Sequence, residues 1–519
     1  MSVFSSAEKG EYFKQYIKYV AFAVCTGIVV YFTMMSFGLV NNLDGIWHYS
    51  NFIAGDWEIS LGRGLQRYAD RARFGLVSEA WNSSLVFLLI GAADCFIIER
   101  FKFKDSFYSY LFVFISVANP VISESLSYSY MSVNFALAYF FAVLAFFCVP
   151  FNAFGDKKKK LIVGIVVSAL LFGISMAFYQ AYIGVFAVLA LVWLMNELRS
   201  EEKAGKVLRA LGLFLLTFVI GGLIYYAITK ALLLRAGISM ASYKGADNYG
   251  VMSILTNLPK GIAAAYSETF KYIFGSRLNA KLEFSGIMIG LVCILILAVS
   301  VIRAIKLFKK NVASGFVFLL LLVLLPGAAS CVCIIAVGNS VTGLMAMGIL
   351  TGLLLFYPLC EEIKPVRLAI NIVYTLMAWY LVASVVNDQI ALKEGITATK
   401  TMAENAIEDV YSGNYLKDVE SVAFVGRAAE NPTFYKSAAY EMANGYAQFG
   451  RWSTDPRNNR ETWTGITRLF CGVTIPICGE GTYSEIVAED EVKKMPVYPN
   501  EGYMKVIDNV LVIKMSDLY

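Results

Sequence analysis

Ionisable side chains crowd one short stretch near the start of the chain, NNLDGIWHYSNFIAGDWEISLGRGL at residues 41–65. Its carboxylates and basic groups, with the arginine that comes just after the stretch, are Asp44, Asp56, Glu58, His48, Arg63 and Arg67. A carboxylate can act as a general base toward a hydroxyl group, and an arginine holds phosphate through paired N–H donors. The combination predicts transfer of a sugar from a lipid-borne phosphate to a hydroxyl acceptor.

The spacing within this stretch leaves two interpretations open for its basic groups. Arg63 and Arg67 are four residues apart, so on a helix they would share a face and form a phosphate clamp; the alternative is that they anchor to lipid headgroups. His48 lies four residues after Asp44 and would meet it on a helix, whereas a lone histidine is more often structural. Aromatic residues interleave with the charges, which suits a cleft at headgroup level.

Further polar residues are candidates for binding the phosphate or sugar of the donor: Glu124, Tyr179, Gln180, Lys260 and Arg277. The carboxylate lies in an expected short outer loop, where a helix-terminal charge is the alternative. The tyrosine and glutamine lie in an expected outer turn, and the usual polarity of turns is the alternative explanation for them. The two basic residues lie in a long loop, where ordinary surface charges are the alternative explanation.

Long apolar runs must position these residues. The chain has 519 residues, 58% of them hydrophobic, and a mean hydropathy of +0.61, well above a soluble domain. Eleven runs are long enough for membrane helices, at 19–40, 81–98, 107–119, 128–150, 161–178, 181–196, 209–234, 283–302, 313–336, 341–358 and 366–386. The predicted fold class is an all-α polytopic membrane protein.

The connectors between these runs predict the orientation in the membrane. Those rich in lysine and arginine alternate with basic-poor ones and lie at 99–105, 155–160, 196–209, 303–311 and 361–367. Cytoplasmic loops carry such an excess, so these connectors and the N-terminus are expected in the cytoplasm of a multi-pass cell-membrane protein. Eleven spans then place the charged first loop and the C-terminus outside. The net charge of +5 gives no indication of nucleic-acid binding.

Two segments outside the apolar runs have structure of their own. Apolar residues recur at helical spacing over residues 251–274, which predicts a helix on the outer leaflet or one packed on the C-terminal domain. After the membrane domain, 1–386, expected strands at 419–427 and 503–515 and a helix at 400–413 indicate an extracytoplasmic α/β domain over 387–519.

The cysteines predict no metal site. No CxxC pair or His–Cys spacing typical of zinc sites is present. Cys471 and Cys478 flank six residues of the C-terminal part. A disulfide between them is predicted if that part faces an oxidising compartment.

Four segments together resemble a known family: the stretch at 41–65, NPVISESLSY at 119–128, SMAFYQAYIGVF at 175–186, and KKMPVYPNEGYMKVIDNVLVIKM at 493–515. They are similar to the bacterial Gtr-type O-antigen glucosyltransferases, membrane enzymes of the GT-C kind. The resemblance covers essentially the whole chain and rests on the order of these short motifs.

The resemblance implies an inverting, metal-independent transfer of glucose or another hexose, without a cofactor. The donor would be undecaprenyl phosphate carrying the sugar, and the acceptor a cell-surface glycan on the outer face. The family places its catalytic carboxylate soon after the first helix, where Asp44 stands. Many relatives have two adjacent acids there, whereas Leu43 precedes a single acid here, so Asp56 and Glu58 are rival candidates for the base.

Two other functions remain as alternatives. A transporter or flippase for a lipid-linked saccharide typically has internal repeats and broken helices at the membrane midplane, and the sequence shows no repeat. A structural partner in envelope assembly would not need acids concentrated in its first loop. The sequence therefore favours the glycosyltransferase.

Overall fold

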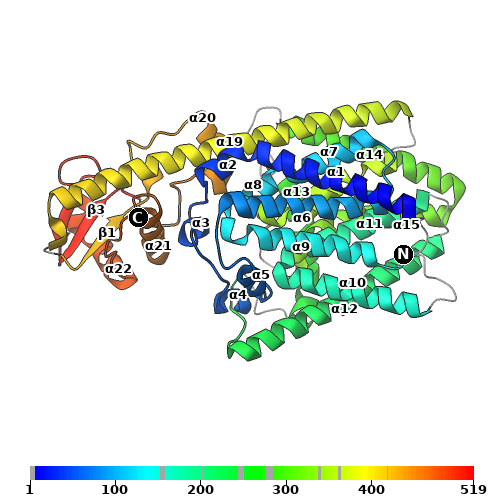
Figure 1. Ribbon diagram of the computed structural model, residues 1–519, viewed down its shortest axis with the longest axis horizontal. Helices are drawn as coiled ribbons and strands as arrows, with labels where there is room; N and C mark the ends of the chain where they lie inside the picture. The colour runs from blue at the N-terminus through cyan, green and yellow to red at the C-terminus, as the bar shows by residue number, and fades with distance from the viewer. Residues whose placement is uncertain are drawn as a thin grey trace.

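The computed structural model describes residues 6–151, 158–199, 204–243, 251–275, 285–336, 340–360, 364–417 and 419–518. Apolar helices form a long bundle, with the N-terminus at one end and a smaller domain, containing the C-terminus, at the other (Figure 1). Three short helices from the 41–78 segment lie at the same end as the smaller domain. The charged stretch and the C-terminal domain therefore face each other.

Ten helical segments in the described part are long and apolar enough to cross a membrane. They are formed by α1 (Ser6–Val30), α6 (Glu79–Phe101), α7 (Ser106–Val117) with α8 (Pro120–Ser127), α9 (Ser129–Cys148), α10 (Lys158–Phe178), η1 (Gln180–Tyr182) with α11 (Ile183–Arg199), α12 (Ala204–Ala236), α14 (Ser285–Lys310), α15 (Val312–Ala329) and α19 (Lys364–Ser412). The predicted fold class is confirmed.

The tenth predicted span, 341–358, is a shorter apolar helix over Met347–Leu359. It consists of α17 (Met347–Leu354) and α18 (Tyr357–Cys360), preceded by the 3₁₀ turn η3 (Gly343–Met345). The residues of α17 are all buried, because α11 and α15 pack against it. A short helix enclosed by protein needs no contact with lipid along its length.

The segment expected as a short outer loop at 119–127 is helical. Asn119 caps α8, since its side chain accepts a hydrogen bond from the amide of Ile122 at 3.1 Å, and Pro120 stands at the first helical position. Both features are typical of a helix N-terminus. The predicted loop residue Glu124 therefore belongs to a helix.

The amphipathic helix predicted over 251–274 is present as α13 (Val251–Phe274). Its main contacts are with α14, α15 and α16 (Val332–Ile335). The Tyr266 hydroxyl donates to the carbonyl of Val323 at 2.6 Å, which ties α13 to α15. Phe270 and Phe274, one and two turns further along, stay 48% and 62% exposed.

The C-terminal domain is joined to the bundle by α19, which continues without a break through the predicted domain boundary at 386–387. The helix runs along the whole bundle and on into the small domain (Figure 1). Asp388 fixes the domain at this junction, because it accepts hydrogen bonds from the Asn444 amide at 2.9 Å and the Tyr446 hydroxyl at 2.7 Å.

The C-terminal domain is mixed α/β. Its three strands are β1 (Ser421–Val425), β2 (Met504–Ile507) and β3 (Val510–Lys514), in the order β1-β3-β2, with β1–β3 parallel and β2–β3 antiparallel. The helices and 3₁₀ turns around them are η4 (Tyr415–Lys417), η5 (Ala428–Glu430), α20 (Ala438–Met442), η6 (Gly445–Ala447), α21 (Pro456–Leu469), α22 (Glu480–Ala488) and α23 (Asp490–Lys494). Every residue of β3 is buried, as expected of a central strand.

The disulfide predicted between Cys471 and Cys478 is wrong, since both thiols are free. Cys478 belongs to a small apolar core with Tyr483, while Cys471 packs against a different cluster. Ile477, between them, pairs with Val422 of β1, and this pairing holds Cys478 in its own core. Burial raises the pKa of both thiols to about 11, which disfavours the reactive thiolate.

Candidate active site

A cavity of about 440 Å³ lies where the first loop, the membrane helices and the C-terminal domain meet. The first loop comes after α2 (Phe32–Phe37) and contains α3 (Asp44–Trp47), α4 (Asp56–Ser60) and α5 (Gln66–Ala72). Five residues predicted for the site line the cavity: Asp44, Glu58, Arg63, Tyr179 and Gln180. The structure thus brings together residues from two distant segments of the sequence.

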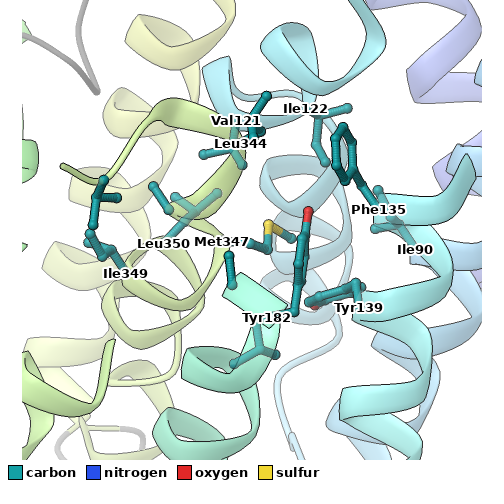
Figure 2. Close-up of a cluster of buried hydrophobic side chains, with 14 of the residues drawn as sticks. Ile90, Val121, Ile122, Phe135, Tyr139, Tyr182, Leu344, Met347, Ile349 and Leu350 are labelled. Atoms are coloured by element: carbon teal, nitrogen blue, oxygen red, sulfur yellow. The ribbon is translucent and has the colours of Figure 1, made fainter. Parts of the chain in front are cut away.

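The floor of the cavity rests on the apolar core of the bundle. Phe135 of α9 and Leu344 of η3 belong to both the core and the cavity wall. In Figure 2, Tyr182 and Met347 lie side by side at the centre of this core, and Phe135 and Tyr139 approach them from α9. Dense packing there gives the polar residues above it a rigid support.

Asp44 is the first residue of α3, and Asn41 fixes the start of that helix. The Asn41 side-chain oxygen accepts from the amides of Leu43 at 3.3 Å and Gly45 at 3.0 Å. The Asn41 amide donates to the carbonyl of Ser127, at the end of α8, at 3.2 Å. Asn41 is buried. This residue therefore ties the position of Asp44 to the membrane helices.

Asn42 makes the corresponding connection to the C-terminal domain. Its side-chain amide donates to the carbonyl of Gln448 at 3.0 Å, and its side-chain oxygen accepts from the amide of Gly450 at 2.6 Å. Asn42 is buried as well. The two asparagines before Leu43 therefore hold the start of α3 from opposite sides, one from each domain.

Close packing of α21 against α3 reinforces this connection. A Cβ atom at Gly465 would lie 2.2 Å from Cγ2 of Ile46 and 3.1 Å from its carbonyl oxygen. Only glycine allows the two helices to approach so closely. α21 therefore lies directly on the helix that begins with Asp44.

Gly465→Ala is expected to weaken this docking by about 1 kcal/mol or more, because overpacking forces the helices apart. Sugar transfer should fall severalfold, and Ile46→Ala in the same chain should recover part of it by removing the nearest atom. Gly481→Ala is the matched control, since a Cβ there has no neighbour within 4 Å. Wild-type transfer by Gly465→Ala, measured in membranes, would contradict the role of this contact.

Arg63 brings a positive charge from the first loop to the cavity. Its guanidinium carbon lies 4.8 Å from the centre of the Tyr179 ring, an arrangement that holds the arginine in place. Its buried Nε has no hydrogen-bond partner, and across the described ranges Arg63 forms no ion pair. A guanidinium in this state is a ready partner for phosphate.

Arg67 and Asp56 lie apart from the cavity, so the predicted two-arginine clamp is not assembled. The Arg67 side chain donates to Asp56 at 2.8 Å and to the carbonyl of Ala54 at 2.8 Å. The side chain of Asp56 is 63% exposed. Arg63 precedes α5 whereas Arg67 lies within it, so the two do not share a helical face.

Glu58 lines the cavity but also serves the local fold. Its Oε2 accepts from the amide of the N-cap residue Gly55 at 2.7 Å, the bond that a glutamate at the third helical position makes in a capping box. Glu58 is 8% exposed. The carboxylate is thereby fixed beside the cavity as part of the helix cap.

Gln180 and Glu124 each hold a neighbouring segment in position. The Gln180 amide donates to the carbonyl of Leu61 at 2.7 Å and to the Tyr225 hydroxyl at 2.8 Å, which joins the first loop to α12. Glu124 lies beside η3, since a Cβ at Gly343 would come 1.8 Å from its Oε2. Gln180 lines the cavity, and Glu124 supports the turn that forms part of its wall.

The two basic candidates in the long loop are not part of the described cavity. Lys260 is exposed on α13 and lies outside the lining of the cavity. Arg277 lies outside the described residues.

His48 packs against two aromatic rings, Phe52 and Tyr130, which also contact each other. Its ring centre is 4.5 Å from Phe52 and 4.6 Å from Tyr130, and its backbone amide donates to the carbonyl of Asp44 at 3.2 Å. Burial lowers the pKa of His48 to about 4. The imidazole is therefore neutral at neutral pH, and its ring contacts are those of a structural residue.

The lowered pKa of His48 makes the free energy of unfolding depend on pH. In the unfolded chain the histidine has a pKa near 6.5, so above that pH it is neutral in both states and burying it costs no deprotonation. Between pH 6.5 and 4 the unfolded state binds a proton that the folded state does not, and the free energy of unfolding falls by up to about 1.4 kcal/mol per pH unit. We expect wild type to lose thermal stability relative to His48→Phe between pH 6.5 and 4, in scans in detergent. Parallel curves would contradict a neutral histidine.

A buried ion pair that was not among the predicted site residues braces the first loop. Asp70 and Arg73 are joined at 2.6 Å, and Asp70 also accepts from the Asn134 side chain at 3.0 Å and the Ala54 amide at 3.0 Å. Burial raises the pKa of Asp70 although these donors oppose the rise. The Arg73 side chain reaches the Asn82 oxygen at 3.0 Å. The spacing of the pair, three residues on a short helix, was the available signal.

The C-terminal domain supplies two more lining residues, Arg457 and Asn458 of α21. They lie some four hundred positions after Asp44 in the chain. No spacing rule connects residues so far apart, so only the fold reveals that they share a cavity with the first loop.

The family model of Glucosyl transferase GtrII matches residues 37–356. No curated protein and no solved structure matches the chain. The matched region contains the whole charged first loop and the segment that brings Tyr179 and Gln180 to the cavity, and it covers more than half of the chain. The chain belongs to the GtrII glucosyl transferase family.

Proposed function

We propose that the protein moves a glucosyl residue from undecaprenyl phosphate to a cell-surface glycan on the outer face of the membrane, with inversion. Family membership implies a glycosyltransferase with a sugar donor and an acceptor. The observation that carries the finer proposal is the shared cavity of Asp44 and Arg63. A base and a phosphate-binding cation are the two groups that this transfer requires.

In the proposed reaction, Asp44 takes the proton of an acceptor hydroxyl. The acceptor oxygen forms a bond to the anomeric carbon of the sugar, and the bond from that carbon to the phosphate oxygen breaks. The electron pair of that bond leaves with undecaprenyl phosphate, whose negative charge Arg63 stabilises. The proton remains on Asp44 until it passes to water.

The position of the cavity supports a lipid-borne donor. Its lining includes residues of α3, α4 and α21, which lie at one end of the bundle of apolar helices (Figure 1). A phosphate in the headgroup layer would lie at such an end, whereas the site of a flippase is expected midway along the bundle. Apolar residues such as Val332 and Leu344 line the cavity together with the charged ones. The basic connectors that alternate with basic-poor ones along the chain favour a cytoplasmic N-terminus.

The direct test is transfer of radiolabelled glucose from undecaprenyl phosphate in membranes that contain or lack the protein. Label should enter envelope glycan only where the protein is present. Undecaprenyl phosphate carrying galactose or mannose tests the choice of hexose. Label that crosses the bilayer while remaining on the lipid would instead support the flippase.

A further inference from the structure

The C-terminal domain reaches into the cavity through the first turn of α21. Asp455 caps this helix, accepting from the backbone amides of Arg457 at 3.2 Å and Asn458 at 3.4 Å. The cap fixes the turn from which Arg457 and Asn458 face the cavity. The close contact of Gly465 with Ile46 packs α21 against α3, and the Asn42 hydrogen bonds hold the segment just before α21, at Gln448 and Gly450.

The charge of Arg457 is not neutralised by its neighbours. Glu461, on the same helix, pairs with Arg460, and so does Glu480 at 3.5 Å. Asp455 is engaged by the helix cap. In the part of the chain that the structure describes, Arg457 forms no ion pair, and its side chain is exposed. The local carboxylates are thus occupied by other groups.

Two arginines therefore line the cavity from different domains. Arg63 is held by Tyr179 at the end of a membrane helix, on the side from which a lipid-borne donor comes. Arg457 belongs to the domain beyond the membrane helices, on the side from which a glycan comes. One substrate phosphate accounts for Arg63 and leaves Arg457 without a ligand.

We propose that Arg457 and Asn458 form an acceptor subsite for a glycan that carries an anionic group, either a carboxylate or a phosphate. The guanidinium binds the anion through paired N–H donors, and the Asn458 amide bonds a neighbouring sugar hydroxyl. This inference rests on the proposed function, because it assigns the second substrate of the same cavity. The subsite selects charged acceptors over neutral ones.

Equilibrium binding by calorimetry, with the protein in lipid nanodiscs, tests the subsite without turnover. The probes are an oligosaccharide of glucuronate, an oligomer of glycerol phosphate, and a neutral dextran oligomer of the same length. At least one acidic probe should bind about tenfold more tightly than dextran, the effect of one charged hydrogen-bonding pair. The better acidic probe identifies the anion as carboxylate or phosphate.

Arg457→Gln should remove the preference for the acidic probe, and Arg457→Lys should keep part of it. Arg468→Gln is the matched control, because Arg468 lies at the other end of α21 and does not line the cavity. Equal affinity for dextran and both acidic probes would overturn the subsite. So would a preference that survives Arg457→Gln, or one lost only in Arg63→Gln, which would place the anion at the donor phosphate position.

The two proposals fail in distinguishable ways. If labelled glucose is not transferred from undecaprenyl phosphate, the proposed function fails, and the binding measurement still decides the subsite. If transfer occurs and the acidic probes show no Arg457-dependent preference, the subsite alone is overturned.

Discussion

Asp44→Asn should reduce glucosyl transfer roughly 10²–10⁴-fold, the usual effect of losing a general base. The amide keeps the shape of the carboxylate but cannot accept the proton of the acceptor hydroxyl. Asp44 starts a helix held by Asn41 and Asn42 through backbone and side-chain hydrogen bonds of their own, so the variant should fold. The measurement is initial rate in membranes at saturating donor, with protein amount normalised.

Two other acid-to-amide changes locate the base. Asp56→Asn should remain active, because Asp56 is exposed, pairs with Arg67 and lies outside the cavity. Glu58→Gln should lose less than Asp44→Asn, because Glu58 caps α4. Normal turnover in Asp44→Asn together with loss in Glu58→Gln would move the base to Glu58. Normal turnover in all three variants would remove the active site from the first loop.

Arg63→Ala should raise the KM for the lipid donor by about ten- to a hundredfold, because a charged hydrogen-bonding pair contributes roughly 1.5–3 kcal/mol. The same variant should also lower kcat if Arg63 stabilises the negative charge of the leaving phosphate in the transition state. Transfer rates measured at several donor concentrations separate the effect on KM from the effect on kcat. Arg63→Lys should recover charge but not the planar pair of donors.

Arg67→Ala is the matched control for this measurement. Arg67 lies four residues further along the chain, pairs with Asp56 and does not line the cavity. Its donor KM should stay near that of wild type. A larger effect in Arg67→Ala than in Arg63→Ala would show that the phosphate binds outside the cavity, and the assignment of Arg63 would be withdrawn.

Most of the bundle could be predicted from sequence, because a long apolar run has few stable alternatives to a membrane helix. The charged stretch after the first such run contributes residues to a cavity, although their roles stay a prediction. Asp44 and Arg63 both line this cavity. Proximity in sequence was a useful guide here because the first loop folds back on itself in short helices.

Spacing alone failed where a side chain had competing partners. Arg63 and Arg67 satisfy a helical repeat, yet the helix begins between them and Arg67 turns to Asp56. The segment containing Glu124 was short and polar enough for a loop, but Asn119 and Pro120 start a helix there. The contribution of Arg457 depends on how the two domains dock, which no local pattern encodes.

α19 is a single helix of 49 residues. At 1.5 Å per residue it measures roughly 74 Å, whereas the hydrocarbon layer of a bilayer is about 30 Å thick. More than half of it therefore lies outside that layer, and the C-terminal domain has a rigid strut where many two-domain proteins have a flexible linker.

The number of residues in this helical strut sets both the distance of the C-terminal domain from the lipid and its rotation about the helix axis. One residue inserted between the membrane and the domain would lift the domain by about 1.5 Å and turn it by about 100°. Such a turn would carry Arg457 away from the first loop even with every cavity residue intact. The length of this segment is thus constrained as tightly as the identity of its contacts, because even a whole helical turn, which restores the rotation, would lift the domain by about 5.4 Å.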